Sequence, residues 1–129
     1  MNLAEMKNMI LFQTNNDADD LGDFQPYIND YINEGYDKAA MAYAGQHVSV
    51  DSDVYNPLKN DKASPDLPDW LHRAIADWAT WLIYRNGNAA KQQRGYAFRN
   101  SAEGLFAVAR GGLETVKPST GRYIVNIPR

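Results

Sequence analysis

Cysteine is absent from the 129 residues of this chain, and histidine occurs only twice. The absence of cysteine excludes disulfide bonds, thiol nucleophiles and thiolate metal ligands. His47 and His72 stand alone in the sequence, and two isolated histidines do not make a zinc site without further ligands at matched spacing. We therefore expect no metal and no other cofactor.

Long apolar runs are also missing. No uncharged stretch approaches the ~20 residues that a membrane-spanning helix needs, so we expect no membrane partner. Met1 is followed by an acid-containing segment with neither a basic n-region nor an apolar h-region, so we expect no secretion by a signal peptide. Hydrophobic residues make up 44% of the chain and charged residues 22%, which favours a single soluble domain.

Motifs of catalysis and of calcium binding are incomplete or absent. The patterns HExxH, GxSxG and GxxxxGK[ST] do not occur. Asp17, Asp19 and Gly22 match the first, third and sixth positions of a calcium-binding EF-hand loop, but Leu21 and Ile28 stand where the fifth and twelfth positions require oxygen ligands. The sequence gives catalysis no positive support, and we expect a protein that is not an enzyme.

Charge is divided unevenly along the chain, although the total is only −3. Residues 1–69 contain four basic and thirteen acidic residues, a net charge of −9. Residues 70–129 contain nine basic and three acidic residues, a net charge of +6. Such a division favours contact between a basic surface of one copy and an acidic surface of the next, which would be a head-to-tail contact. Two separate solvated faces would give the same division.

Helical periodicity recurs in four stretches. The spacing of apolar residues predicts helices over 3–12, 23–44 and 66–86, and a fourth from residue 89 to Gly111-Gly112. Gly35 lies inside the second and marks the close approach of another helix. Aromatic side chains are expected to hold the core: Trp70, Trp78, Trp81, Phe98 and Phe106. The short joint at 86–88 predicts that the last two helices are antiparallel neighbours.

Two stretches do not follow the helical period. Residues 46–66 form a long connection, in which Gln46 to Val50 alternate enough for a short strand. The tail over 113–129 reads as strand, turn and strand, with Tyr123, Ile124, Val125 and Ile127 in its second strand. The predicted fold is therefore mainly α, a small bundle of about four helices over 1–112 with a short β-hairpin-like C-terminal tail.

The predicted fourth helix is basic. Lys91, Arg94 and Arg99 are interleaved with glutamines and aromatic residues, a pattern that could follow phosphates. The same three cations could instead contact acidic residues of a neighbouring copy, and Asp30 and Glu34 lie one turn apart on the polar face of the second helix. These five residues and the second strand of the tail, which would add to a partner's sheet edge, are the predicted interface or DNA-facing residues.

Several segments resemble the small head–tail connector (adaptor) proteins of tailed phages. The segment Asp30-Tyr31-Ile32-Asn33-Glu34-Gly35-Tyr36 is similar to a helix of that family, and so is Leu67-Pro68 at the start of a long helix. The helical pair formed by 71–79 and 94–106 also resembles the family, and the resemblance extends over about residues 20–110.

The resemblance implies a helical, non-enzymatic subunit that forms a homo-oligomeric ring beneath the portal of the virion. Its partners would be further copies of itself, the portal protein and tail-completion proteins, with DNA passing through the centre of the ring. Such a protein is assembled in the host cytoplasm. The alternative is a DNA-binding regulatory or packaging accessory protein that uses the basic fourth helix.

Overall fold

The computed structural model describes the backbone of residues 1–116 and the side chains of residues 1–111. Within that part the chain is mainly helical, as the sequence predicts. The elements are α1 (Leu3–Thr14), the 3-10 helices η1 (Asn15–Asp20) and η2 (Gln25–Tyr27), α2 (Ile28–Ala44), α3 (Asp69–Arg85) and α4 (Ala89–Val116). The predicted β-hairpin, including Tyr123, Ile124, Val125 and Ile127, lies outside the described residues, except that its first residues up to Val116 belong to α4.

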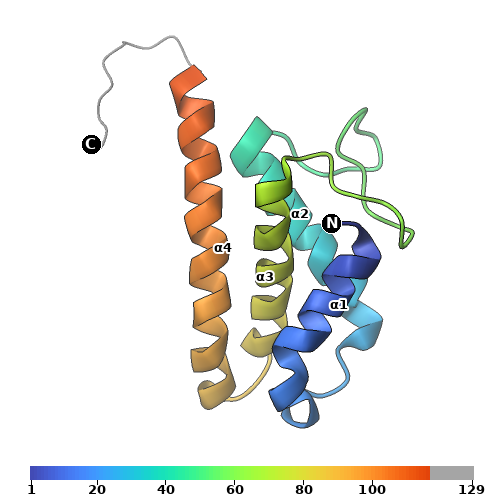
Figure 1. Cartoon of the computed structure of the whole chain (residues 1–129), viewed down its shortest axis with the longest axis vertical. Coiled ribbons are helices and arrows are strands. Elements are labelled where there is room, and N and C mark those ends of the chain that lie inside the picture. The colour runs from blue at the N-terminus through green and yellow to red at the C-terminus, as the bar shows by residue number, and fades with distance from the viewer. Residues whose placement is uncertain (117–129) are drawn as a thin grey trace.

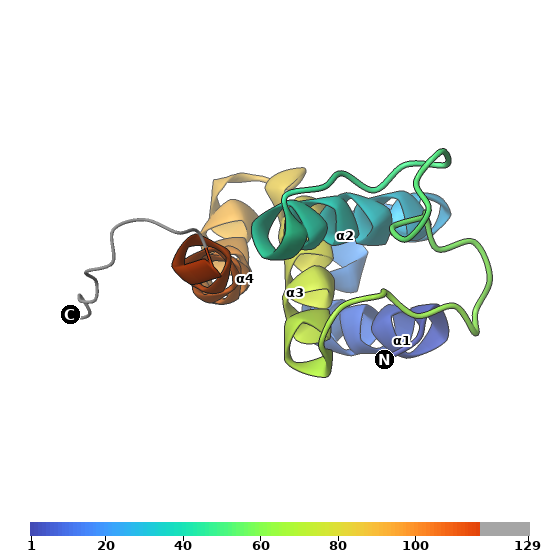
Figure 2. The same ribbon diagram turned by 90° about the horizontal axis from the view of Figure 1, so that it is seen from above.

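The bundle is arranged around α3. Figure 1 shows α3 beside the antiparallel α4, with α1 on its other side, and Figure 2 shows that α2 covers a third side. Thirteen of the seventeen residues of α3 are buried, more than a helix with one solvent-facing side would bury. The long connection before α3 and helix α4 lie on opposite sides of the molecule (Figure 2).

One expectation about the core needs correction. Trp78, Trp81 and Phe106 are buried as predicted, but Trp70 lies in the first turn of α3 and keeps 46% of its surface exposed. The core also holds a carboxylate: Asp77 of α3 is 1% exposed, and Gln13 of α1 and Ser101 of α4 both donate hydrogen bonds to it. These contacts satisfy the buried carboxylate.

Gly35 marks the predicted close approach of two helices. A Cβ atom built on it would lie 2.7 Å from the backbone oxygen of Ile75, so α2 and α3 meet at a distance that only glycine allows. At the end of α2, Gly45 adopts a φ of 69° and ends the helix, as expected.

The helix boundaries differ from the prediction where proline and glycine act. Pro26 lies in η2, and α2 begins five residues later than predicted, at Ile28. Conversely, Gly111 does not end α4, which continues to Val116.

The connection between α2 and α3 is held by hydrogen bonds of its own, and the expected strand at Gln46 to Val50 is wrong. No strand occurs in the described part of the chain. Instead, Ser49 N donates to Tyr55 O at 2.9 Å, which closes a compact turn. Further along, Leu3 N donates to Ala63 O at 2.8 Å, so the connection is fastened to the start of α1.

Candidate functional site

A groove of about 550 Å³ lies between α2 and α4. Its floor is aromatic, because the ring of Trp78 from α3 lies 6.1 Å from the ring of Phe106 from α4. Lys38 of α2 places its Nζ atom 4.6 Å from the Trp78 ring, a cation–π contact. Met41 forms part of one wall and is 38% exposed. The groove therefore offers an apolar surface that water reaches.

Charged side chains stand around this floor. Arg85 of α3 and Arg110 of α4 line the groove, are exposed, and form no ion pair with any other described residue. Asp37 also lines it, but its carboxylate is engaged by His47 Nδ1 at 2.9 Å and by the amide of Val48 at 2.8 Å. Lys38 lies over the Trp78 ring and Asp37 is hydrogen-bonded, so the charged groups of the groove that remain without such a contact are Arg85, Arg110 and Glu34. Two positive charges against one negative charge favour a negatively charged occupant.

Helical spacing brings these residues together. Glu34, Lys38 and Ala42 recur every four residues along α2, and Phe106 and Arg110 do the same on α4. Trp78 and Arg85 are two turns apart on α3. The indole Nε1 of Trp78 is buried and has no hydrogen-bond partner among the described residues.

A second cluster joins the N-terminal region to α4. Asp17 of η1 is 5% exposed and accepts hydrogen bonds from Lys91 Nζ at 2.7 Å, from the Tyr84 hydroxyl at 2.6 Å and from Arg94. Asp20 lies 3.2 Å from the same lysine nitrogen. The acidic and basic halves of the sequence therefore meet inside one molecule at this point.

The contacts of Asp17 shift the pKa values of its partners and its own. The hydrogen bond from Lys91, followed by that from Tyr84, lowers the pKa of the Asp17 carboxyl below its usual value of 3.8. Burial and the hydrogen bond to Asp17 raise the pKa of the Tyr84 hydroxyl above its usual value of 10.0. The hydrogen bonds to Asp17 and Asp20 raise the pKa of Lys91. At neutral pH Asp17 therefore stays negatively charged, Lys91 stays positively charged and Tyr84 stays protonated. The cluster is a structural ion pair and not a pair of groups that exchange a proton.

The predicted interface residues of α4 are placed differently from one another. Lys91 is 8% exposed and turned inward, which corrects its assignment to an open surface. The side chain of Arg94 is 59% exposed but contacts Asp17. Arg99 lies 5.6 Å above the Trp81 ring, 5.7 Å above the Tyr96 ring and 3.3 Å from Glu103. These three cations do not form the continuous free basic surface that the sequence suggests.

The acidic pair of α2 is on the surface as expected. Asp30 and Glu34 are both exposed, and Glu34 also lines the groove. The four predicted residues of the tail lie outside the described part. Sequence reasoning missed Lys38, Arg85 and Arg110 as members of one site. The four-residue spacing of Glu34 and Lys38 was a signal for one wall, but nothing local in the sequence places α4 opposite to it.

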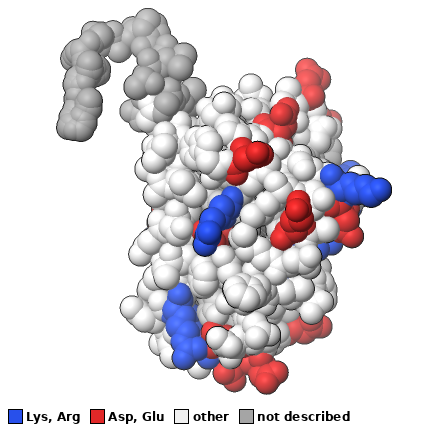
Figure 3. Space-filling model, viewed as in Figure 1, with Lys and Arg blue, Asp and Glu red and all other residues white. Residues whose placement is uncertain are grey.

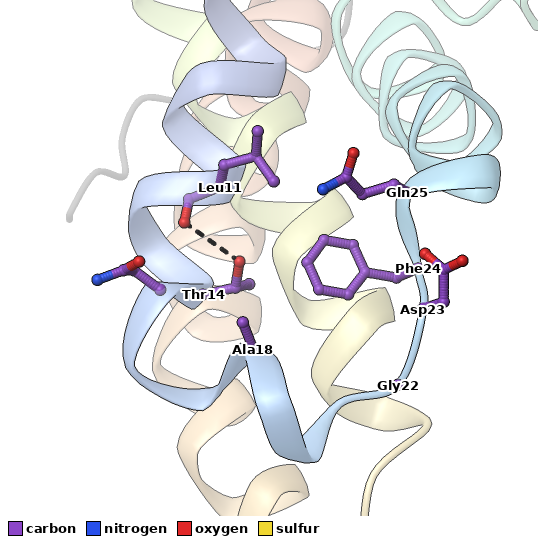
Figure 4. A pocket seen from close by; sticks show the side chains of 8 residues that line it. Leu11, Thr14, Ala18, Gly22, Asp23, Phe24 and Gln25 are labelled. Carbon is purple, nitrogen blue, oxygen red and sulfur yellow. Dashed lines mark hydrogen bonds between the residues drawn. The ribbon is translucent and has the colours of Figure 1, made fainter.

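A smaller hollow of about 290 Å³ lies where α1 leads into η1 and the following segment. Figure 4 shows the ring of Phe24 facing the end of α1 across it. The Thr14 hydroxyl on its wall donates to the carbonyl oxygen of Ile10 at 2.9 Å, with a longer contact of 3.4 Å to Leu11, so it is engaged within its own helix. This hollow holds no set of side chains suited to catalysis.

Two further kinds of feature are absent from the part of the chain that the structure describes. None of its helices is long and apolar enough to cross a membrane. The described side chains, those of residues 1–111, include no group of three or more from His, Cys, Asp or Glu that could hold a metal ion. Comparison with protein-family models, curated proteins and solved structures found no match.

Proposed function

We propose that this chain is a non-enzymatic structural subunit that assembles with copies of itself, as a ring beneath the portal in the head–tail connector of a tailed phage. The observation that supports assembly most strongly is the outer face of α4, which carries no charge over most of the helix. The resemblance of residues 20–110 to connector proteins supports the particular assembly and its place in the virion.

The outer face of α4 consists of exposed residues at spacings of three and four. They are small, apolar or amide side chains: Ala90, Gln93, Ala97, Asn100, Gly104, Ala107, Val108 and Gly111. A helix at a protein surface ordinarily presents charged residues on the side opposite the core. Figure 3 shows white atoms along most of the side of the view occupied by α4. Cover by another protein surface accounts for a helix face of this composition.

Two glycines on this face meet no described residue that would explain them. A Cβ atom at Gly104 or at Gly111 would meet nothing within 4 Å. Each glycine within a helix lowers its stability by about 1 kcal/mol relative to alanine. A neighbouring backbone that approaches the helix closely would require the missing Cβ atoms. We take that neighbour to be a second copy of the chain.

The alternative, DNA binding by α4, gains no support from the side-chain contacts. Lys91 and Arg94 are engaged by Asp17, and Arg99 lies over two aromatic rings beside Glu103. Binding of DNA phosphates would compete with these intramolecular contacts. We therefore keep assembly as the proposed function.

Light scattering on the full chain tests this proposal, over about 10–500 µM, alone and with the portal protein of the same phage. We expect a discrete oligomer in at least one of the two conditions. The variant Gly104→Leu should weaken assembly at least about tenfold while it leaves the fold intact, because it fills the space of the approaching backbone. Asn8→Leu, at an exposed position of α1, is the matched control. A monomer in both conditions would contradict the proposal.

A further inference from the structure

The groove between α2 and α4 has a counterpart on the opposite side of the same molecule. The turn at 49–55 projects from the connection between α2 and α3, away from α4 (Figures 1 and 2). A recess on one side and a projection on the other allow each copy to engage the next in the same way. Repetition of such a contact gives a ring when the rotation closes.

The turn is rigid enough to act as a projection. Ser52 Oγ accepts hydrogen bonds from the amides of Tyr55 at 2.9 Å and of Val54 at 3.2 Å, and Tyr55 O accepts one from Ser49 N at 2.9 Å. Tyr55 is 8% exposed and its ring packs edge-on against Tyr36 of α2, with centroids 6.3 Å apart. The turn is thus anchored in the core at its base.

The tip of the turn combines exposed apolar side chains with acidic ones. Val50 is 67% exposed and Val54 is 48% exposed. Asp51 and Asp53 lie between them, are exposed, and form no ion pair within the described residues. The tip is therefore apolar and negatively charged.

The groove complements both properties. Met41, 38% exposed, supplies most of its apolar surface, above the largely buried rings of Trp78 and Phe106, and Arg85 and Arg110 supply two cations that form no ion pair within the described residues. We infer that the groove between α2 and α4 receives the 50–54 turn of a second copy, with Asp51 and Asp53 facing Arg85 and Arg110. This inference depends on the proposed function, because it names the contact through which copies would assemble.

Charge also argues against two other segments of the chain as occupants of the groove. The segment 117–129 of the chain contains three basic residues and no acidic one, so it does not complement two arginines. The acidic η1 segment has Asp17 buried and Asp20 paired with Lys91, and it lacks flanking exposed valines. Within the described residues, the 50–54 turn combines exposed acidic side chains with an exposed valine at each end.

A charge exchange tests the contact on the full chain by sedimentation velocity. One variant carries Arg85→Glu and Arg110→Glu, and a second carries Asp51→Lys and Asp53→Lys. We expect each variant alone to associate at least about tenfold more weakly than the wild type, because like charges then face each other. An equimolar mixture of the two should recover association, since each contact then joins opposite charges.

Matched controls change as much charge elsewhere on the exposed surface. Lys59→Glu with Lys62→Glu is the control for the groove, and Asp19→Lys with Asp23→Lys is the control for the turn; all four positions are exposed. Circular dichroism verifies that every variant is folded. The controls should associate like the wild type.

The possible results separate this inference from the function on which it depends. If the wild type associates and the two variants associate equally well, or if their mixture does not recover, the contact is wrong and assembly stands. If the wild type is a monomer alone but assembles with the portal protein, the contact is again wrong as a means of self-association. A wild type that is monomeric in both conditions contradicts both proposals.

Discussion

Replacement of Asp17 by asparagine is the change that best tests the internal pairing of the two halves of the chain. Asparagine keeps the size of the side chain and removes the charge that Lys91 and Arg94 share. Lys91 and Arg94 donate to one carboxylate oxygen of Asp17, and the Tyr84 hydroxyl donates to the other. Asparagine keeps only one of these oxygens, and the amide nitrogen in place of the other accepts no hydrogen bond. The variant therefore leaves donors without an acceptor in a buried place.

The expected loss follows from the burial of the cluster. Removal of one partner from a buried ion pair costs about 3–5 kcal/mol. Here the loss should be smaller, because Lys91 keeps Asp20 at 3.2 Å and the side chain of Arg94, 59% exposed, can return to water. We expect Asp17→Asn to lower the free energy of unfolding by about 2–3 kcal/mol, which is a fall of about 10 °C in Tm.

Urea unfolding followed by circular dichroism measures this loss. The matched control is Asp19→Asn in the same 3-10 helix, where the side chain is exposed and forms no ion pair with a described residue. The control should change stability by less than about 0.5 kcal/mol. Equal effects of the two variants would refute the buried-pair account.

The pH dependence of the unfolding free energy is a second test on the same variant. The pKa of Asp17 is lowered in the folded state, so its stabilising contribution is complete above the ordinary value of 3.8 and is lost as the pH falls through the folded-state value. The difference in unfolding free energy between wild type and Asp17→Asn should be constant above about pH 5 and shrink below about pH 4. A difference that stays constant down to pH 2 would contradict the assignment of the effect to this carboxylate.

Three further predictions concern the helix contacts. Gly35→Ala should destabilise the fold by about 2 kcal/mol in urea unfolding, because the added Cβ would lie 2.7 Å from Ile75 O. Gly104→Ala should instead stabilise the fold by about 0.5–1 kcal/mol, because its Cβ would meet nothing within 4 Å and alanine favours a helix more than glycine does. Tyr84 has a raised pKa in the folded state, so its contribution to stability is complete below its usual value of 10.0 and is lost progressively as the pH rises from there through the higher folded-state value. The Tm should therefore fall above about pH 10, and it should fall less steeply in Tyr84→Phe. Phe106→Ala removes a 3% exposed ring from beside Trp78 and should cost about 3–4 kcal/mol, measured in the same assay.

The helices could be predicted from the sequence because the pattern that specifies a helix lies within the helix itself. Apolar residues at spacings of three and four over 3–12 and 66–86 match α1 and α3 to within a few residues. The close approach at Gly35 was predictable for the same reason, since glycine inside a strong amphipathic helix needs a neighbour. The start of α2 was missed because the sequence around Pro26 fits a 3-10 turn as well as a first α-turn.

The candidate sites could not be predicted in the same way, because they join residues that are far apart in the sequence. Asp17 and Lys91 are separated by 74 positions, so the charge division of the chain could not tell an internal pair from a contact between copies. The groove depends on the distance between α2 and α4, which no periodic pattern in either helix specifies. Trp70 illustrates the remaining error, since an aromatic residue in the first turn of a buried helix can project beyond its neighbours.

Electron microscopy of the full chain mixed with the portal protein that the proposed function gives it as a partner tests the central claim most directly. The account predicts rings of one fixed copy number seated on one end of the portal, absent when Gly104→Leu replaces the wild type and present with the Asn8→Leu control. A portal that carries no added density with the wild-type chain, together with a monomeric chain in solution, would contradict it.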